Sequence, residues 1–551
     1  MNRASIFHQV MSPWCYPLDN TQIEIKIKTG KEVNQVILIY GDPHAFQQDK
    51  HVWTWQSFKL EMLMSGNGEY HRYFTLAITP PNKRLKYCFI LVSDDEKCVY
   101  GENGFQNPDE QIDHWNYFFY PYHHQSDIYK APDWVRDTVW YQIFPDRFNA
   151  SPMVKKWPTG SVTNAIHYGG NLVGIIDKLP YIHDLGCTGI YLTPIFLSPS
   201  SHKYDTSDYY RIDPKFGTED ELIKLVQEAH RLNIKVMLDG VFNHTGLLFE
   251  PWILARKDSK SSYRDWFYFT KNGYETFSFA KNMPKLNTSN PELIEYFCKV
   301  GQYWIQKADI DGWRLDVANE ISPIFLRQFR KAVLSIKDVY ILGEVWHDSN
   351  PWLMGDQFDG VMNYPYTRLI IDFIITQSIS LEQFRNRVDD YLNRYASPIY
   401  TNQFNLFDSH DTERLMSKAN NNQQRVKQAL ALLFISIGSP CIYYGTEIGM
   451  EGKTDPDCRR LMQFEPDPKI HPLYQLIQSF IKLRKENKCL SDKASWIWIK
   501  HPDLLMIRRS DIILIINPLN QSFDNPYQGI ELYNDSLSKQ IEPYDIKLIK
   551  V

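Results

Sequence analysis

The sequence predicts an α/β protein in which a (β/α)8 barrel is flanked by two β domains. In the middle of the chain, short apolar segments alternate with amphipathic helical segments, as in a parallel barrel. Before and after it, strand-like segments follow one another without a helical period. The length of 551 residues also exceeds one ordinary core. We expect an N-terminal β-sandwich at 1–125, the barrel at 126–487 with an inserted subdomain at about 245–290, and a small C-terminal β domain at 488–551.

The N-terminal segment is predicted to form a sandwich. Its apolar or alternating runs are separated by Gly, Asp and Pro turns and occupy 23–27, 36–40, 73–77 and 87–91. The polar, histidine-rich stretch 122–130 is predicted to be a linker, in which His123 and His124 are exposed to solvent.

The barrel prediction depends on eight short apolar segments that we interpret as parallel strands. They occupy 139–144, 188–193, 234–239, 312–316, 340–345, 359–363, 403–407 and 440–444. A helix is expected at 218–231, where Thr218 and Glu221 form a capping box, and another is expected from Pro291 to Lys307. The insertion after the third strand, near 245–285, lacks clear periodicity, and such long loops on a compact fold are usually functional.

The last part of the chain returns to a strand pattern. The runs 496–499 and 511–516 are apolar and follow the final barrel segment. They predict the small C-terminal β domain.

Composition excludes several function classes. The net charge is −5 with a sequence pI near 6.4, and no basic stripe is present, so no nucleic-acid partner is expected. The eight cysteines form no CxxC pair, which favours reduced, mostly buried thiols in a cytoplasmic protein. The first 20 residues lack a secretory signal and no apolar run reaches the length of a membrane span, so no membrane partner is expected.

Polar residues gather where four predicted strands end. The segments are 239–244 (DGVFNH), 312–320 (GWRLDVANE), 343–347 (GEVWH) and 407–411 (FDSHD). Active sites of (β/α)8 barrels lie at the C-terminal ends of the strands. These four segments therefore deliver acids, histidines and an arginine to one rim.

In this order and position, the four segments resemble the signature regions of the α-amylase superfamily, glycoside hydrolase family 13. A finer similarity is to the cyclomaltodextrinase, neopullulanase and maltogenic amylase group. It is carried by Trp313, the run 317–320, and the segments 283–287 (MPKLN), 440–445 (PCIYYG) and 455–460 (DPDCRR), together with the N-terminal β domain.

The resemblance implies retaining hydrolysis of α-glucosidic bonds by three carboxyl groups. Asp316 is expected to be the nucleophile, Glu344 the general acid and then base, and Asp411 the group that holds the distorted sugar. Arg314 lies two residues before Asp316, hence on the same strand face, where it can hold Asp316 ionised. Asp239 is expected to support the site rather than react.

Further residues are expected to bind substrate. They are His202, Tyr204, His244, Phe277, Arg314, Glu320, Trp346, His410, Asp455 and Arg459, with Asn243 in support and Asn319 beside Glu320. Tyr204 is expected to stack on a sugar ring. Ordinary packing remains the alternative for Phe277 and Trp346, and a structural ion pair for Asp455 and Arg459.

No cofactor is expected. Members of the group often carry a calcium loop after the first strand, whose weak candidates here are Asn149, Ser151, Gly170 and Asn171. Calcium needs six to eight oxygen ligands, and the neutral residues of this loop predict a lost or very weak site. No HExxH or Cys/His zinc spacing appears either.

The leading hypothesis is a hydrolase of cyclodextrins, short malto-oligosaccharides and pullulan, with endo α-1,4 cleavage and some transglycosylation. The resemblance also implies a homodimer formed through the N-terminal domain. The alternatives are an exo-acting α-glucosidase or glucosyltransferase of the same superfamily, and a non-catalytic carbohydrate-binding relative. The retained acids weigh against the last.

Overall fold

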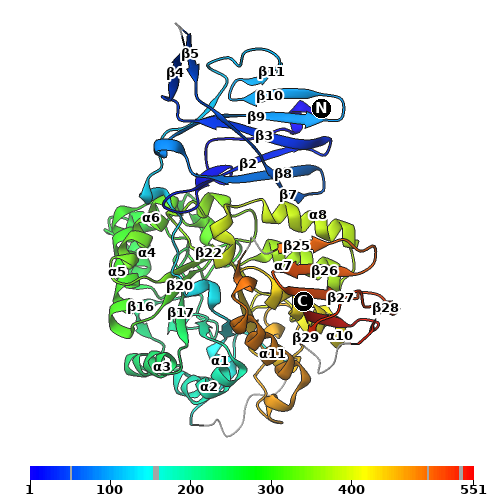
Figure 1. Cartoon of the computed structure of the whole chain (residues 1–551). Helices are drawn as coiled ribbons and strands as arrows, with labels where there is room; N and C mark the ends of the chain where they lie inside the picture. Colours follow the sequence, from blue (N-terminus) through cyan, green and yellow to red (C-terminus); the bar gives the residue numbers. More distant parts are fainter. Residues whose placement is uncertain (50–51, 153–160, 493–495, 533–537) are drawn as a thin grey trace. The chain divides into compact units, whose positions relative to one another are not determined.

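A computed structural model describes residues 1–49, 52–152, 161–492, 496–532 and 538–551 (Figure 1). The chain forms two compact units. One comprises Met1–Lys130 with Leu353–Gly355 and Ile379–Tyr400. The other comprises Ala131–Trp352, Asp356–Ser378 and Thr401–Val551.

The N-terminal unit is a β-sandwich. One sheet has the order β1-β2-β8-β7, with bounds Cys15–Pro17, Ile23–Gly30, His71–Ile78 and Leu63–Asn67. The other has the order β11-β10-β9-β3-β6, with bounds Gly104–Gln106, Lys97–Gly101, Leu85–Ser93, Val33–Gly41 and Phe58–Glu61. Strand β12 (Phe118–Tyr120) pairs with β9, and β4 (Phe46–Asp49) pairs with β5 (Val52–Trp55). Alternate residues of β2, Ile23, Ile25 and Ile27, are fully buried in the core between the sheets.

A helix from the middle of the sequence completes this unit. Helix α8 (Leu381–Leu392) packs against β7. The carboxylates of Asp389 and Asp390 accept hydrogen bonds from the backbone N–H groups of Asn67 and Glu69 at 2.8 and 2.9 Å. These bonds satisfy backbone donors that would otherwise lose their partners on burial.

The prediction for His123 was wrong. Its ring is only 3 % exposed and its Nε2 lies 2.8 Å from the carbonyl oxygen of Asp19. The neighbouring His124 is exposed, as predicted. A polar sequence does not reveal that one side chain of a linker turns back to satisfy a carbonyl group.

The second unit contains the barrel, and the predicted fold class is confirmed. Among the described residues, the eight parallel strands run in the order β22-β21-β20-β17-β14-β13-β24-β23. A parallel bridge between Met362 and Phe404 brings the two ends of this sheet together. The strand bounds are Trp140–Ile143 (β13), Gly189–Leu192 (β14), Lys235–Gly240 (β17), Gly312–Leu315 (β20), Tyr340–Gly343 (β21), Gly360–Val361 (β22), Phe404–Asn405 (β23) and Ser439–Tyr443 (β24).

Helices surround these strands (Figure 1). Their bounds are Pro145–Phe148 (α1), Leu172–Leu185 (α2), Glu219–Arg231 (α3), Glu250–Lys257 (α4), Pro291–Ala308 (α5), Pro323–Leu334 (α6), Tyr364–Ile370 (α7), Leu415–Lys418 (α9), Gln423–Ile435 (α10) and Pro472–Glu486 (α11). The predicted capping box of α3 is present, and Asn290 caps α5 just before Pro291. The insertion after β17 contains α4 and the short pair β18 (Phe269–Thr270) and β19 (Gly273–Tyr274).

The C-terminal sheet has the order β25-β26-β27-β31-β29. Its strands are Trp496–Ile499, Leu505–Arg509, Ile512–Ile516, Ile546–Lys550 and Ile530–Glu531, and the short strands β28 (Phe523–Asp524) and β30 (Gln540–Ile541) pair beside it. Two buried arginines, Arg484 of α11 and Arg509 of β26, contact the C-terminal end of α10, and Arg509 joins it to this sheet. Arg484 donates to the carbonyl groups of Phe434, Ser436 and Gly438, and Arg509 of β26 donates to that of Ile435. They satisfy carbonyls that a helix leaves without partners at its C-terminus.

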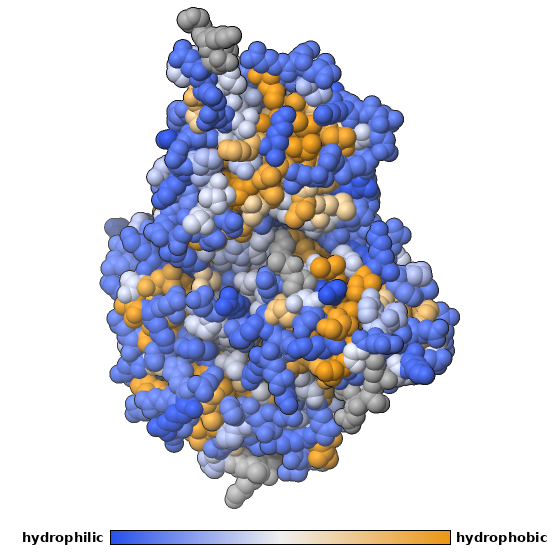
Figure 2. Space-filling view, viewed as in Figure 1, coloured by the Kyte–Doolittle hydropathy of each residue, from blue (hydrophilic) through white to orange (hydrophobic). Residues whose placement is uncertain are grey.

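The burial of the cysteines agrees with the sequence analysis. All eight cysteines lie in described segments and are free, and most are buried. In the described part of the chain, no helix is long and apolar enough to cross a membrane. Figure 2 shows apolar residues gathered over the N-terminal sandwich. Large exposed apolar side chains of this unit include Trp53, Phe58, Leu60, Leu63 and Met64.

Candidate active site

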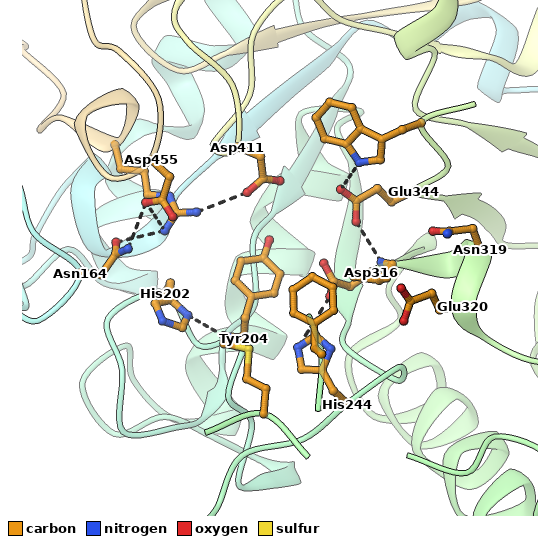
Figure 3. A pocket seen from close by; sticks show the side chains of 15 residues that line it. Asn164, His202, Tyr204, His244, Asp316, Asn319, Glu320, Glu344, Asp411 and Asp455 are labelled. Atoms are coloured by element: carbon orange, nitrogen blue, oxygen red, sulfur yellow. Dashed lines mark hydrogen bonds and ion pairs between the residues drawn. The ribbon is translucent and has the colours of Figure 1, made fainter. Parts of the chain in front are cut away.

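A cleft of about 420 Å³ lies at the C-terminal ends of the barrel strands (Figure 3). The residues that line it are Asn164, His202, Tyr204, His244, Phe277, Met283, Asp316, Val317, Asn319, Glu320, Glu344, Trp346, Asp411, Asp455 and Arg459. Its size is that of a site for a small ligand.

Asp316 and Glu344 follow two adjacent strands, β20 and β21, and meet at one arginine. The Nη1 atom of Arg314 donates to Asp316 Oδ1 at 2.8 Å and to both oxygens of Asp239 at 3.0 Å. Its Nη2 atom lies 2.8 Å from Glu344 Oε2 as an ion pair, without hydrogen-bond geometry. Arg314 is fully buried, so these contacts act at low dielectric.

Two N–H groups orient Glu344. Its Oε2 accepts from the backbone of Val317 at 2.9 Å, and its Oε1 accepts from Trp346 Nε1 at 3.1 Å. Val317 has a φ of 46°, a left-handed conformation that a β-branched residue rarely adopts. This local strain turns the chain sharply after Asp316 and directs the N–H group of Val317 toward Glu344.

Asp316 is buried between two charged groups, Arg314 and Glu344. Burial raises the pKa of Asp316 well above its usual range, Arg314 opposes that shift, and the neighbouring charge of Glu344 adds to it.

Asp411 stays ionised beside this pair. His410 Nε2 lies 3.0 Å from Asp411 Oδ2, and Arg459 Nη2 lies 3.3 Å from Oδ1. Burial alone would raise the pKa of Asp411, but His410 and Arg459 outweigh it and hold the pKa well below its usual range. The hydroxyl of Tyr204 contacts His410 Nε2, and the two rings are parallel with centroids 5.4 Å apart.

Two histidines stay neutral at the same wall of the cleft. Burial lowers the pKa of His244 to about 3, with a further contribution from Lys285, and burial lowers that of His202 to about 4. The His244 ring stacks on Phe277 with centroids 4.8 Å apart, and its Nε2 lies 4.0 Å from Asp316 Oδ2. Neutral imidazoles suit hydrogen bonding to hydroxyl groups, because each ring offers a donor and an acceptor.

The two ends of the cleft differ in character. Beside Glu344, the half-exposed Trp346 stacks on Tyr364 with ring centroids 3.7 Å apart, and Glu320 pairs with Lys285 at 2.5 Å. The opposite end holds the Asp455–Arg459 ion pair at 2.9 Å. Figure 3 shows Glu320 and Asp455 on opposite sides of the three central acids.

The structure gathers the residues that the sequence singled out. Most of them line the cleft, while Arg314 and His410 lie directly behind it, in contact with Asp316 and Asp411. Asn243 contacts Lys285 and is buried. Sequence reasoning missed Asn164 and Met283 as lining residues. Met283 belongs to a quoted motif, whereas Asn164 follows no strand and carries no sequence signal of its own.

The calcium candidates do not fit a calcium ion. Asn171 donates from Nδ2 to the Ser151 carbonyl at 3.0 Å and accepts from Ser151 N at 3.2 Å and Gly174 N at 2.7 Å. Asn149 donates from Nδ2 to the Gly174 carbonyl at 3.0 Å. At Gly170 an added Cβ would lie 2.1 Å from a backbone oxygen. The side-chain oxygen of Asn171 and the carbonyl oxygens of Ser151 and Gly174 are thus already hydrogen-bonded within the protein.

The charge of the loop also argues against a calcium site. The sequence has no Asp or Glu between Asp146 and Asp177, and it has two lysines, Lys155 and Lys156, in that interval. Among the described residues, no group of three or more His, Cys, Asp or Glu side chains is placed to hold a metal ion. A loop without carboxylates does not compensate a divalent charge.

The chain is similar over nearly its whole length to characterised proteins. Residues 142–470 match the family model "Alpha amylase, catalytic domain", and residues 1–124 match "Alpha amylase, N-terminal ig-like domain". A maltogenic α-amylase of Bacillus acidopullulyticus is 41% identical over 552 residues, which cover 96% of this chain and 93% of that protein.

Further relatives agree. A cyclomaltodextrinase of Geobacillus thermopakistaniensis (strain MAS1) is 42% identical over 96% of this chain and 93% of that protein. A solved structure of a cyclomaltodextrinase superposes with a TM-score of 0.92 at 34% identity and covers all of both chains. The chain therefore belongs to the α-amylase family of glycoside hydrolases.

Proposed function

We propose that this glycoside hydrolase cleaves α-1,4-glucosidic bonds in cyclodextrins and short malto-oligosaccharides with retention, using Asp316, Glu344 and Asp411. The observation that carries the proposal is the contact of one buried guanidinium, that of Arg314, with both Asp316 and Glu344. Retaining glycosidases need a carboxylate nucleophile and a carboxylic acid held beside the same bond.

The roles of Asp316 and Glu344 follow from the different contacts that each makes with Arg314. It donates a hydrogen bond with full geometry to Asp316 and forms only an ion-pair contact with Glu344. The negative charge is therefore better stabilised on Asp316, which we assign as the nucleophile, and Glu344 takes the role of the proton donor.

Two displacements then complete the reaction. Asp316 attacks the anomeric carbon while Glu344 gives its proton to the leaving glycosidic oxygen, and a glycosyl ester forms on Asp316. Glu344 next removes a proton from water, which attacks the same carbon and releases Asp316. A sugar hydroxyl in place of water gives transglycosylation.

Asp411 and its neighbours hold the reacting sugar. The ionised carboxylate of Asp411 accepts hydrogen bonds from ring hydroxyls, and the positive charge that develops at the anomeric carbon is stabilised by the surrounding acids. His244 and His410 bind hydroxyls of the same ring, and Tyr204 packs against it. Trp346 and Phe277 are platforms for the glucose units on the leaving side.

The substrate class rests on the relatives. Proteins named cyclomaltodextrinase, maltogenic α-amylase and, at 39% identity over 92% of this chain, neopullulanase 2 of Thermoactinomyces vulgaris are similar to this chain in sequence. We therefore include pullulan among the substrates. The cleft extends on both sides of the central acids, which suits cleavage within a chain or ring.

The test compares two acids with two leaving groups. Glu344→Gln should lower kcat on β-cyclodextrin by about 10²–10⁴-fold, because the leaving oxygen lacks a proton donor. The loss should be smaller on an aryl maltoside with a good leaving group, whereas Asp316→Asn should inactivate both reactions. Equal losses in Glu344→Gln on both substrates would contradict the acid role. Product analysis on β-cyclodextrin, pullulan and soluble starch would rank the substrates.

We also propose that the protein is cytoplasmic and forms a homodimer through the N-terminal unit. A relative named intracellular maltogenic amylase, from Bacillus subtilis, is 41% identical over 90% of this chain, and free thiols suit a reducing compartment. The exposed Phe58, Leu60, Leu63 and Met64 supply an apolar surface for association. Light scattering on Leu63→Glu/Met64→Glu beside wild type tests the dimer. A monomeric wild type would refute it.

A further inference from the structure

Asn164 stands at one end of the cleft, between the two members of an ion pair. Its Nδ2 donates to Asp455 Oδ1 at 3.0 Å, and its Oδ1 accepts from Arg459 Nη1 at 3.0 Å. Arg459 Nη1 itself lies 2.9 Å from Asp455 Oδ1. The three side chains therefore form a closed ring of polar contacts that faces the cleft (Figure 3).

This end of the cleft is the non-reducing side of the bond that breaks. Glu344 protonates the leaving oxygen, so the leaving glucose units lie on its side, with Trp346 and Glu320. In Figure 3 Asn164 and Asp455 lie on the far side of Asp411 from Glu344 and Glu320. A glucose unit bound beyond the reacting sugar meets this polar ring.

Arg459 couples the ring to the catalytic centre. Its Nε donates to the His410 carbonyl at 2.8 Å and its Nη2 lies 3.3 Å from Asp411 Oδ1. With those two nitrogens occupied, Nη1 is the atom that Asn164 and Asp455 hold. Without Asn164, Asp455 keeps one contact in the ring and is 40% exposed, so it is free to turn toward solvent.

The backbone around Asn164 is fixed independently of its side chain. Ser201 Oγ donates to the Asn164 carbonyl at 2.8 Å, and the buried Arg147 donates to the Thr163 carbonyl at 3.0 Å and to the Arg459 carbonyl at 3.3 Å. These bonds remain when the Asn164 side chain is replaced. The backbone thus keeps its position when the amide is removed. A substitution of Asn164 therefore tests the contacts with Asp455 and Arg459 rather than the conformation of the loop.

We infer that Asn164 is a specificity-determining residue, which holds Asp455 and Arg459 in the orientation that binds the second glucose unit on the non-reducing side. The amide of Asn164 donates to the carboxylate from its nitrogen and accepts from the guanidinium at its oxygen, so one side chain satisfies both charged partners. The inference rests on the proposed function, since it assumes the direction in which the glucan lies.

Two aryl glycosides distinguish an effect on binding of the second glucose unit from a general effect on catalysis. 4-Nitrophenyl α-glucoside places one glucose on the non-reducing side, and 4-nitrophenyl α-maltoside places two. Asn164→Ala should lower kcat/KM on the maltoside about tenfold, the effect of losing a hydrogen-bonded group beside charged partners, and change that on the glucoside less than twofold. Asn164→Asp keeps the acceptor for Arg459 but repels Asp455, so it should show the same selectivity loss. Asn164→Gln keeps both the donor and the acceptor, so it should retain part of the wild-type preference for the maltoside.

Ile166→Ala is the matched control, because Ile166 lies on the same loop, is exposed and does not line the cleft. It should leave both rates unchanged, and melting temperatures should match wild type for all four variants. An equal loss on both glycosides, or no loss on either, would overturn the inference. A wild-type protein that cleaves neither glycoside would instead overturn the proposed function, which keeps the two failures distinguishable.

Discussion

Arg314 sets the charge balance of the site. It is a single buried cation beside the carboxyl groups of Asp239, Asp316 and Glu344. Its planar fork reaches all three groups, which the single point charge of lysine does not do. The arginine therefore contributes geometry as well as charge, and these contributions are separable by mutation.

Arg314→Lys tests the contribution of the fork. The substitution keeps one positive charge in the cluster, so the fold should persist, as far-UV circular dichroism would show. Lysine orients at most one or two of the acids, so kcat/KM on maltotriose should fall at least about 100-fold. A variant with wild-type rates would show that charge alone suffices.

His8 gives the N-terminal unit a defined response to acid. Its ring is buried, with Nδ1 2.7 Å from the Lys26 carbonyl and Nε2 2.8 Å from the Tyr87 hydroxyl, and burial lowers its pKa to about 4. As pH falls below about 6.5, the unfolded chain binds a proton that the folded chain excludes. The contribution to stability is full above pH 6.5 and is lost as pH falls toward 4.

Calorimetry of His8→Gln measures this contribution. Between pH 7 and pH 5, wild type should lose about 2 kcal/mol more unfolding free energy in the N-terminal unit than the variant does. The variant is less stable at pH 7 but has the shallower pH dependence. Parallel pH profiles for the two proteins would contradict the assignment.

At the scale of elements, the sequence predicted the strands and helices, whose apolar patterns are periodic. It missed features that depend on a single side-chain contact. The spacing of Arg314 and Asp316 placed both on one strand face, and their 2.8 Å contact agrees with this. Period and caps likewise predicted the barrel strands and α3. Asn164 and His123 depend on single side-chain contacts to segments distant in sequence, which no periodic pattern records.

The amide of Asn171 acts as a clasp between two elements. It caps α2 through Gly174 and holds Ser151, which follows α1, through two hydrogen bonds. Helix capping by Asn is worth about 1 kcal/mol. These hydrogen bonds of Asn171 hold Ser151 beside the start of α2 without a cation.

Chelation of metal ions and substitution of Asn171 should therefore differ in their effect on the melting temperature. Neither EDTA nor added calcium should change the melting temperature of wild type, while Asn171→Ala should lower it by about 2–4 °C. Asn171→Asp keeps the cap and loses the donor to Ser151, so it should be intermediate. Stoichiometric calcium retained by chelator-treated wild type, measured by atomic emission, would contradict this account.

At the scale of the whole molecule, the order of the domains was predictable, whereas the exchange of a helix between units was not. Alternation and helical period distinguish β segments from the barrel, and both are visible in the sequence. Helix α8 has an ordinary amphipathic sequence within the barrel region, yet it belongs to the N-terminal unit. Nothing in its own residues specifies which unit it joins.

The stability of the second unit should depend on Arg509, although this residue does not line the cleft. Arg509→Met removes the donor to the Ile435 carbonyl and to the carbonyls of Cys489, Leu490 and Asp492. Leaving buried carbonyls without partners should lower the melting temperature by several degrees. The kcat on short substrates should stay within about twofold of wild type. Unchanged thermal stability would show that solvent replaces these bonds.

The arginine pair also limits how this protein can be recombined with its relatives. A chimera that exchanges everything after α11 keeps Arg484 but replaces Arg509, and the last turn of α10 then depends on whatever the donor sequence supplies at that strand position. A crossover is therefore safe only if the incoming sheet brings an arginine to the same register. The modular order of the domains along the chain conceals this requirement, because the cap of a barrel helix is encoded in another domain.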